Sequence, residues 1–431
     1  GSTDFPLSTA QSVLQPTHGG GLYDGFVVQI ANQLPAVDLN DGDPGNGIDY
    51  GPVIWTEAGT PGAPSTPAAL VNGTGLTVSV PYRETLVSAE VRFVDPSGSA
   101  DETAISPPDG SAEELRVTPI GGIVSTYYPL TGTLRLTGGT TTADYQATLR
   151  TLAYQNTSEN PTPGARRVVV AISDGLDENL PRAVSTVTVV ASNDPPQLTL
   201  PGPVSTIEEG TLALSGISVA DVDAGASPIQ LTLSVPLAAG TLSVTASGAA
   251  TVTGVGSSSL QITGPLADVN ATLATLSFTG APDFTTNAGP GSPDTPVELT
   301  VVASDQGNSG AGGPKTDTGT LLISVDPVND APSFTPGGDV TVDEDSGSYA
   351  APWATGISAG PPDEAHQSLS FSVTGNTNPG LFGAGPSIDA SGRLSFTPAP
   401  DANGVATLTV VLRDNGGTAH GGGDTSAPLT F

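Results

Sequence analysis

The sequence has no cysteine and no methionine in its 431 residues. Disulfide bonds, thiol catalysis and thiolate metal sites are therefore excluded. Lysine and arginine together number 11, against 43 aspartates and glutamates, and Lys315 is the only lysine. The resulting net charge of −32 argues against binding of nucleic acid through a basic face, and it favours the attraction of divalent cations.

Long apolar runs and histidines are also scarce. No run approaches the ~18 residues of a membrane span, and no signal peptide is recognisable, so we expect export to be directed by sequence outside this chain. The histidines His18, His366 and His420 all stand in polar or Gly/Pro-rich stretches, and no G-x-S-x-G motif occurs. Because a histidine-based triad or zinc site lacks its raw material, we expect no enzymatic activity.

Glycine and proline, at 55 and 40 residues, are abundant. Between them lie short segments in which apolar and polar residues alternate, for example residues 76–80, 231–235 and 369–373. Such alternation is typical of antiparallel sheets packed on one face, and many short strands between turns indicate β-sandwiches. The sequence therefore predicts an all-β fold of three tandem β-sandwich modules, with a short β segment before them.

Two connectors set the predicted boundaries. Asn193-Asp194-Pro195-Pro196 and Asn329-Asp330-Ala331-Pro332 each follow a β-type run, and their prolines favour a stiff, extended path. In both, a glutamate follows the aspartate after the same interval: Glu208 and Glu344. We therefore divide the chain into an N-terminal segment, 1–33, and three modules, 34–194, 195–330 and 331–431. The Asn-Asp oxygens are available either to a turn or to a cation.

An internal repeat relates the first two modules. Residues 144–154 recur in pattern at 268–278, with an aspartate, two leucines and an aromatic residue at matching positions. We predict an Asp-capped single helical turn there, with Leu149 and Leu152 directed inward. Each module also has a late strand that ends in an aspartate turn, at Asp174, Asp305 and Asp414.

The two ends of the chain differ from the rest. The motifs Asp4-Phe5-Pro6, Gln15-Pro16-Thr17-His18-Gly19-Gly20 and residues 24–30 resemble part of one SBBP-type β-propeller repeat. The closing strand of the third module, 428–431, is shorter than its counterpart at 321–325. Two interpretations follow: a fragment of a longer array, or a subunit whose leading segment completes the trailing sandwich of a neighbouring copy by strand addition.

The second connector carries a family resemblance. Residues 328–334 resemble the inter-repeat linker of cadherins. Residues 144–156 with 162–175, and 218–223 with 263–278, are similar to cadherin-like and proteoglycan-type tandem repeats of large bacterial surface proteins. In the third module, residues 342–347, 357–364 and 396–398 resemble the same bacterial class. Unlike cadherins, the linkers here lack a second asparagine, and no mid-domain D-R-E is present. The resemblance implies Ig-like or cadherin-like sandwiches in an extracellular or cell-surface protein of a bacterium.

The cadherin layout further implies calcium at the two junctions between modules, since Ca²⁺ binds six to eight hard oxygens. The implied ligands of the lower junction are Glu57, Asp174, Asn193, Asp194, Asp221 and Asp223. Those of the upper junction are Glu208, Asp305, Asn329, Asp330, Asp363 and Glu364. The alternative is that these side chains only cap turns and solvate loop tips.

We interpret the chain as a structural array: a stalk or filament subunit, stiffened by calcium and linked by strand exchange between copies. The expected partners are other copies of the chain or further modules of a longer chain. The alternative is an adhesin that binds a glycan or a surface protein. An adhesin predicts a distinct set of binding loops in one module only.

Overall fold

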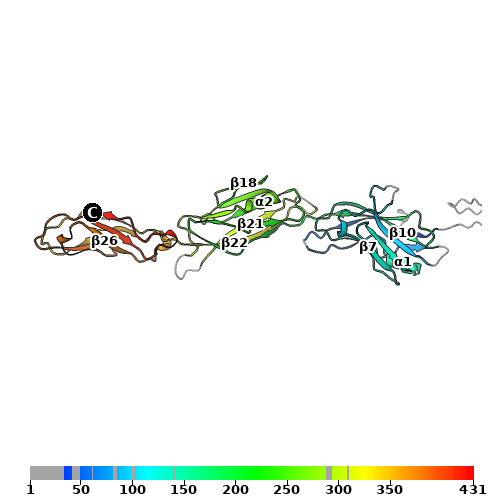
Figure 1. Ribbon diagram of the computed structural model, residues 1–431, viewed down its shortest axis with the longest axis horizontal. Coiled ribbons are helices and arrows are strands. Elements are labelled where there is room, and N and C mark those ends of the chain that lie inside the picture. The colour runs from blue at the N-terminus through cyan, green and yellow to red at the C-terminus, as the bar shows by residue number, and fades with distance from the viewer. Residues whose placement is uncertain are drawn as a thin grey trace, which may run out of the picture. The chain divides into compact units, whose positions relative to one another are not determined.

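The computed structural model describes residues 34–40, 49–60, 62–80, 85–98, 102–138, 141–287, 294–307 and 310–431. The propeller-repeat interpretation falls on residues 1–33, which lie outside them. Within the described residues the fold consists of strands, two short α-helices and four 3₁₀ turns (Figure 1). None of the helices found there has the length and apolar character needed to cross a bilayer. The all-β prediction is confirmed.

The first sandwich has a six-stranded sheet ordered β2-β11-β10-β5-β8-β7, a three-stranded sheet β3-β9-β6, and the pair β1-β4. Its elements are β1 (Ala36–Asp38), β2 (Tyr50–Thr56), β3 (Ala68–Ala69), β4 (Thr77–Ser79), β5 (Ser88–Val94), β6 (Glu113–Arg116), β7 (Val124–Tyr128), β8 (Thr133–Thr137), α1 (Thr142–Leu149), β9 (Ala153–Asn156), β10 (Gly164–Ser173) and β11 (Ala183–Val190).

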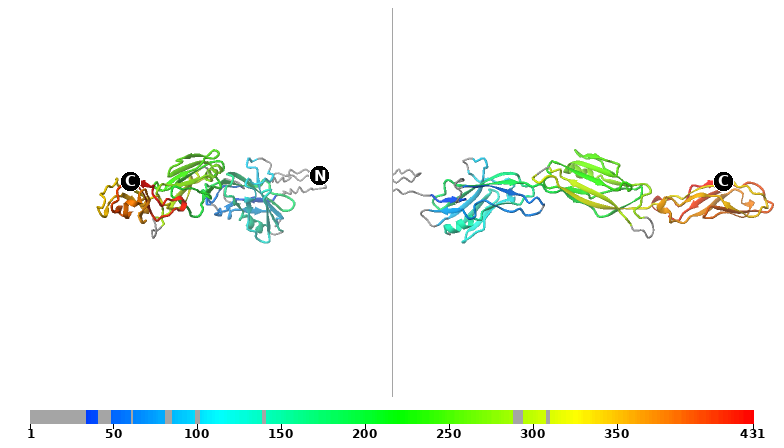
Figure 2. Two further views of the ribbon diagram at one scale, coloured as in Figure 1. Left: turned by 60° about the vertical axis from the view of Figure 1, so that its left-hand side comes forward. Right: turned by 180° about the vertical axis from the view of Figure 1, so that it is seen from behind.

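The second sandwich repeats this plan, with a six-stranded sheet β13-β22-β21-β16-β19-β18, a three-stranded sheet β14-β20-β17 and the pair β12-β15 (Figure 2). Its elements are β12 (Gln197–Thr199), β13 (Val204–Ile207), β14 (Thr211–Ala213), β15 (Ser218–Ala220), β16 (Pro228–Ser234), β17 (Gly240–Ser243), β18 (Thr251–Thr253), β19 (Ser259–Pro265), α2 (Leu266–Leu273), β20 (Ser277–Gly280), β21 (Val297–Ser304) and β22 (Thr316–Asp326).

The third sandwich is smaller, with the sheets β24-β28-β27 and β26-β29-β30 and the pair β23-β25. Its strands are β23 (Ser333–Thr335), β24 (Tyr349–Pro352), β25 (Thr355–Ser358), β26 (Ser370–Asn376), β27 (Phe382–Ile388), β28 (Arg393–Pro398), β29 (Leu408–Arg413) and β30 (Leu429–Thr430). A 3₁₀ turn, η2 (Pro362–Glu364), precedes β26.

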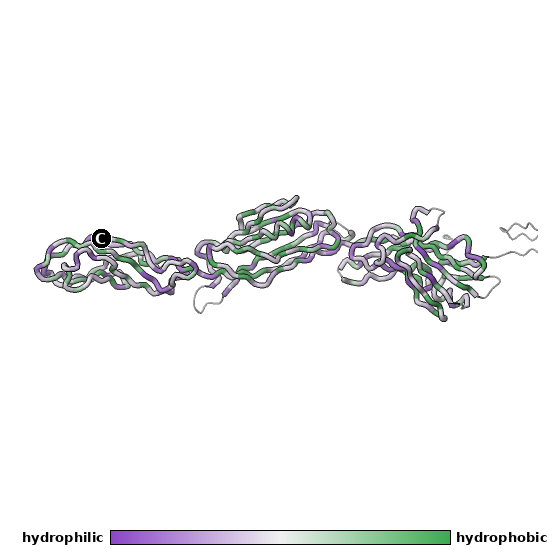
Figure 3. Tube along the Cα trace, viewed as in Figure 1, coloured by the Kyte–Doolittle hydropathy of each residue, from purple (hydrophilic) through white to green (hydrophobic). Residues whose placement is uncertain are grey.

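Each sandwich has its own hydrophobic core, and hydrophobic residues recur along the strands of all three (Figure 3). In the first core Trp55 packs edge-on against Tyr154 at 5.7 Å between ring centroids. The chain divides into two compact units. One holds the first sandwich with residues 307–315, and the other holds the second and third sandwiches. The predicted module boundaries stay a prediction.

The repeated segment forms a helix longer than predicted. Both α1 and α2 span eight residues, or about two turns, in place of a single turn. The cap of α1 is Thr141, and Asp144 completes a capping box by accepting the N–H of Thr141 at 3.2 Å. Leu149 and Leu152 are buried, as predicted. The aspartate therefore stabilises the first turn from inside the helix and is not its cap.

Truncation of Leu149 tests how far the first core depends on α1. Leu149→Ala should lower the free energy of unfolding by about 2–5 kcal/mol, because it removes a fully buried side chain and leaves a cavity. Urea denaturation monitored by tryptophan fluorescence measures this change. Leu130→Ala is the matched control, since Leu130 is 88% exposed, and its effect should stay within about 0.5 kcal/mol. Equal effects of both changes would contradict the assignment of α1 to the core.

Candidate metal centre

Carboxylates gather where the chain leaves the second sandwich. Strand β13 runs parallel to β22, with Ile207 opposite Asp326. Both strands therefore end at the same end of the sheet. Glu208, which follows β13, and the connector 327–330, which follows β22, start next to each other. This edge lies within a single compact unit together with the third sandwich.

Glu208 holds the connector. Its backbone N–H donates to Asp326 O at 3.0 Å, and its side-chain Oε1 accepts the backbone N–H of Val328. The side chain is 5% exposed, and its second oxygen, Oε2, has no hydrogen-bond partner in the described residues. A buried carboxylate oxygen without a partner is costly to the folded state.

The connector is also held by the third sandwich. Asn329 Nδ2 donates to Gly423 O at 2.6 Å and to Asp414 Oδ1 at 3.1 Å. Its Oδ1 accepts from Gln367 Nε2 at 2.7 Å. The backbone N–H of Asp330 donates to Glu364 Oε1 at 2.7 Å. Amide and carboxylate groups thus fix the connector on both sides.

Three further carboxylate oxygens in this region are buried and lack a hydrogen-bond partner among the described residues: Asp363 Oδ1, Glu364 Oε2 and Asp414 Oδ2. Asp363 and Glu364 stand in η2, and Asp414 follows β29. With Glu208 Oε2 they make four orphaned oxygens around one connector. None of the ion pairs found in the described residues joins these carboxylates to an arginine or lysine.

The electrostatics reflect this crowding. Burial raises the pKa of Glu208, and repulsion from Asp363, Asp330 and Asp283 raises it further. Burial likewise raises the pKa of Asp330, with Asp283, Glu209 and Asp363 adding to the shift. The pKa of Glu364 is raised by burial and by Asp330, Asp363 and Asp414. A bound cation would offset all three penalties.

The donor set fits a hard cation in chemical type. Carboxylate and amide oxygens are the ligands of Ca²⁺, which tolerates irregular geometry. The histidine that follows η2, His366, has its Nδ1 2.9 Å from the backbone oxygen of Asp363 and is exposed. In the structure as it stands, no three acidic or histidine side chains of the described residues are arranged to hold an ion. The fit therefore rests on the orphaned oxygens and not on a closed coordination shell.

The first sandwich has the same arrangement at the end of β2. The backbone N–H of Glu57 donates to Val190 O at 3.1 Å, and Glu57 Oε2 accepts the N–H of Ser192 at 2.9 Å. Asn193 and Asp194 are almost fully buried. Asn193 donates its backbone N–H to Ala311 O at 2.8 Å. Glu57 therefore has the place in the first sandwich that Glu208 has in the second.

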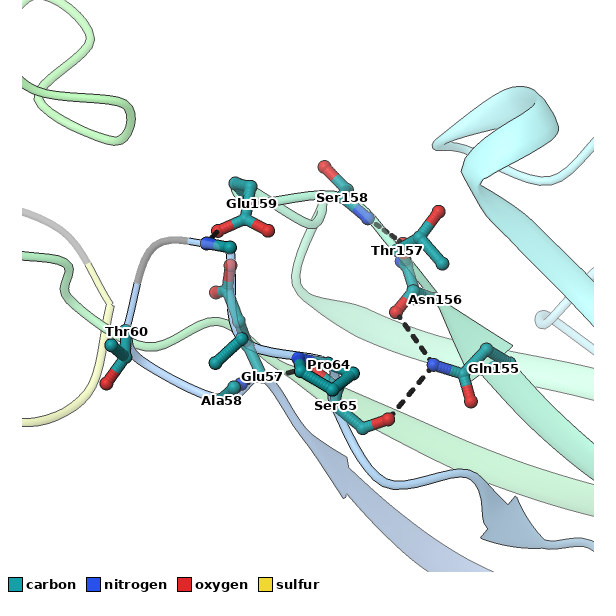
Figure 4. Close-up of a pocket in the computed structure, with 12 residues that line it drawn as sticks. Glu57, Ala58, Thr60, Pro64, Ser65, Gln155, Asn156, Thr157, Ser158 and Glu159 are labelled. Atoms are coloured by element: carbon teal, nitrogen blue, oxygen red, sulfur yellow. Dashed lines mark hydrogen bonds between the residues drawn. The ribbon is translucent and has the colours of Figure 1, made fainter.

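A polar pocket of about 220 Å³ lies beside Glu57. Gln155 Nε2 donates to Ser65 O at 3.0 Å on one side of it, and Glu159 accepts the N–H of Gly62 at 2.9 Å on the other (Figure 4). Its walls are the loop after β2 and the end of β9.

Asp221 and Asp223 form a turn after β15 in the second sandwich. Asp221 Oδ1 accepts the N–H groups of Asp223 at 3.2 Å and Ala224 at 3.0 Å, and Asp221 Oδ2 is buried without a hydrogen-bond partner among the described residues. Burial, with Asp223 as its neighbour, raises the pKa of Asp221 to about 7. The turn-capping interpretation therefore accounts for Oδ1 but not for Oδ2.

Two of the residues predicted for these sites lie elsewhere. Asp174 follows the last residue of β10, whereas Glu57 lies near the first, because Thr56 pairs with Val190 and Val189 with Gly164. Ten strand residues, about 33 Å, separate these ends. Asp305 is likewise separated from Glu208 by the length of β22. Placing Asp174 and Asp305 with these glutamates was wrong, since a late strand runs away from the connector that follows it.

Sequence reasoning missed Asp414, Asp283 and Gln367 as members of the upper site. A signal for Asp414 existed: its aspartate turn ends the late strand of the third module, and the chain direction places that turn beside the preceding connector. The 124-residue repeat also relates Asp283 to Glu159. Gln367 has no local signal.

Several solved structures are similar to this chain. Mouse cadherin-23 EC22-24 is 16% identical, covering 92% of this chain and 96% of its own, with a TM-score of 0.36. Human CDH23 EC21-23 is 14% identical, with coverages of 88% and 96% and a TM-score of 0.37. Mouse protocadherin-24 EC1-3 is 14% identical, with coverages of 90% and 98% and a TM-score of 0.32. No protein-family model matches the chain, and no curated protein does.

The raised pKa of Asp221 gives a pH-dependence with a definite sign. The folded state binds this proton more tightly than the unfolded state, so the stabilisation is complete below the ordinary value near 4 and is lost as the pH rises to about 7. In EDTA, the melting temperature of the second unit should therefore fall between pH 4 and pH 7. Asp221→Asn should flatten this fall, as measured by calorimetry.

Asp339→Asn is the control for that change, because Asp339 is exposed. It should leave the profile unaltered. An Asp221→Asn profile as steep as that of the unchanged protein would show that Asp221 titrates normally.

Proposed function

We propose that this chain is an extracellular array of β-sandwich modules that serves as a stalk or filament subunit of a bacterial surface protein, with calcium stiffening the joint between its second and third sandwiches. The observation that carries the proposal is the set of four buried, unpartnered carboxylate oxygens around the connector 327–330. A repeated array without a catalytic constellation in its described residues, joined by such connectors, is suited to spacing and projection.

Hydrogen bonds within the chain hold the connector against both the second and the third sandwich. Asn329 and the backbone of Asp330 bind the third sandwich, and Glu208 binds Val328 from the second. These bonds define the path of the connector. Repulsion among the neighbouring carboxylates opposes them at neutral pH.

Calcium would be held by Glu208, Asp330, Asp363, Glu364 and Asp414, with the oxygen of Asn329 beside them. Its chemistry here is charge neutralisation by several oxygen ligands at once. Glu57, Asn193 and Asp194 in the first unit, and Asp221 and Asp223 in the second, are proposed calcium ligands because their side chains carry the oxygen donors that Ca²⁺ prefers. The proposal also includes a link between copies by strand exchange.

A calcium titration followed by thermal melting tests the joint. Extracellular calcium modules bind with dissociation constants on the order of 10⁻⁴–10⁻³ M, so 10 mM CaCl₂ should stabilise the second unit by about 1.4–2.7 kcal/mol. Asp414→Asn should abolish most of this gain, because it removes a charged ligand that no other residue replaces. Differential scanning calorimetry measures both effects.

Asp174→Asn is the matched control, since Asp174 also ends a late strand but lies at the far end of the first sandwich from Glu57. It should keep the calcium gain of the second unit. The calcium proposal fails if 10 mM CaCl₂ and EDTA give the same melting curve.

Stiffening is a separate consequence. Calcium should narrow the distribution of the molecule's largest dimension in small-angle X-ray scattering, because carboxylates that otherwise repel one another then bind the same cation. Asp414→Asn should scatter like the calcium-free chain under both conditions. An unchanged distribution on adding calcium, despite a rise in melting temperature, would show that the ion stabilises a sandwich without stiffening the joint.

A further inference from the structure

The first two sandwiches share one plan, so residues that occupy the same place in both can be compared directly. The 124-residue repeat relates β9 to β20. Tyr154 of β9 pairs with Ala68 of β3, and Phe278 of β20 pairs with Leu212 of β14. The two three-stranded sheets therefore have the same register, and a difference between them marks a feature that one sandwich has and the other lacks.

The loop after the buried glutamate is one such difference. Eleven residues separate Glu57 from Ala68, whereas four separate Glu208 from Leu212. The first sandwich thus has seven additional residues, in the proline-rich stretch 58–67, of which residue 61 lies outside the described residues. This longer loop forms one wall of the polar pocket beside Glu57.

The end of β9, which forms the opposite wall, differs as well. The first sandwich has Gln155-Asn156-Thr157-Ser158 there, and the second has Thr279-Gly280-Ala281-Pro282 at the corresponding positions. Two amides and two hydroxyl groups are replaced by one hydroxyl group and three residues without polar side chains. The polar lining is therefore particular to the first sandwich, as the adhesin interpretation requires of a binding site.

Hydrogen bonds hold the two walls of the pocket together. Across it, Gln155 Nε2 donates to Ser65 O at 3.0 Å, and the N–H of Gly62 donates to Glu159 Oε2 at 2.9 Å (Figure 4). Within the loop, Ser65 Oγ accepts the N–H of Ala58 at 3.0 Å. Gln155 is 7% exposed, so packing also fixes its position. The pocket is formed before a ligand arrives, and binding does not require the loop to be ordered.

The lining favours a polar ligand without negative charge. Among the described residues that line the pocket, the charged ones are Glu57 and Glu159, both acidic. Glu159 Oε1 and Gln155 Oε1 accept no hydrogen bond within the described residues, so both are available to a ligand that donates. The uncharged polar residues of the lining are Thr60, Ser65, Gln155, Asn156, Thr157 and Ser158.

We propose that this pocket binds one neutral sugar residue, with the carboxylate of Glu159 and the amide of Gln155 as its main polar contacts. Sugar hydroxyls both donate and accept hydrogen bonds, as this mixture of groups requires. The volume of about 220 Å³ is smaller than the about 300–1,000 Å³ of sites for drug-sized ligands, so it has room for a single ring. The acidic residues repel uronic and other acidic sugars.

The first sandwich is then a glycan-binding module carried by the array, a role that goes beyond spacing and projection. The site depends neither on the calcium joint nor on strand exchange, because both of its walls belong to the first sandwich.

Saturation-transfer NMR on the full chain in EDTA tests the site. The neutral probes are the methyl glycosides of glucose, galactose, mannose and N-acetylglucosamine, and the acidic probe is methyl glucuronide. At least one neutral probe should bind with a dissociation constant on the order of 1 mM, as expected for a ligand of this size. Methyl glucuronide should bind at least about tenfold more weakly. No saturation transfer to any neutral probe, or equal binding of the acidic probe, overturns the proposal.

A substitution taken from the second sandwich locates the binding. Gln155→Thr introduces the residue found at the corresponding position, Thr279. It should weaken binding of the neutral probe about tenfold, because the shorter side chain loses the amide contact. Gln261→Thr is the matched control, since it makes the same change in β19 of the second sandwich, and it should leave binding unchanged. A Gln155→Thr chain that binds as tightly as the unchanged chain contradicts the assignment.

Glu159→Gln keeps the proposal testable if Gln155→Thr unfolds the loop. It retains an oxygen for the N–H of Gly62 and removes one negative charge. The preference for the neutral probe over methyl glucuronide should therefore fall about threefold or more, a change in selectivity that a damaged pocket would not produce. An unchanged preference overturns the role of Glu159.

The glycan site and the calcium joint fail separately. Sugar binding in EDTA from a chain whose melting does not respond to calcium overturns the joint alone. A calcium response from a chain that binds no neutral probe overturns the glycan site alone.

Discussion

One interaction recurs at the end of both large sandwiches: a buried glutamate accepts a backbone N–H of the connector that leaves the same sandwich. Glu57 accepts from Ser192, and Glu208 accepts from Val328. The parallel pairing of β2 with β11, and of β13 with β22, makes this geometry unavoidable, because it brings the first and last strands of the sandwich to one edge. In the second unit this bond holds Val328, the second residue of the connector 327–330, against the second sandwich.

Because the chain has few lysines and arginines, the carboxylates around the connector 327–330 are not paired with basic side chains in the described residues. The first sandwich has a buried arginine, Arg166, whose Nε donates to Glu113 Oε1 at 2.7 Å. The hydroxyl of Tyr154 donates to the same oxygen at 2.6 Å. A buried charge pair of this kind needs such complete hydrogen bonding. At the connector after the second sandwich no arginine or lysine of the described residues takes that part, so backbone N–H groups and Asn329 satisfy some oxygens and leave the others available to a cation.

The third sandwich is smaller, with two three-stranded sheets and one pair of strands. Its connector is held by the hydrogen bonds from Asn329 to Gly423 and from the backbone of Asp330 to Glu364. Its core has fewer buried residues than the cores of the other two sandwiches, and Tyr349, Phe396 and Phe431 in it are only partly buried.

The sequence by itself determined the all-β class, the short strands and the kinship of the first two sandwiches, because alternation and the 124-residue repeat are local signals. It also placed Leu149 and Leu152 in the core. The sequence predicted Asp144 as the N-cap of the helix, whereas the N-cap is Thr141 and Asp144 is the third helical residue of the capping box. The backbone conformation of Thr141 decides this, and the sequence pattern does not reveal it. The carboxylates nearest the connectors in three dimensions were only partly found, since Glu208 and Glu364 were named but Asp414 was not.

Only the tertiary structure decided which aspartates share a site. Asp305 is closer in sequence to Asn329 than Asp414 is, yet the eleven residues of β22 carry the chain from one end of the sheet to the other. Asp305 and Asn329 therefore lie at opposite ends of β22 although they are close in sequence. Asp414, from the next sandwich, is far away in sequence but accepts a hydrogen bond from Asn329.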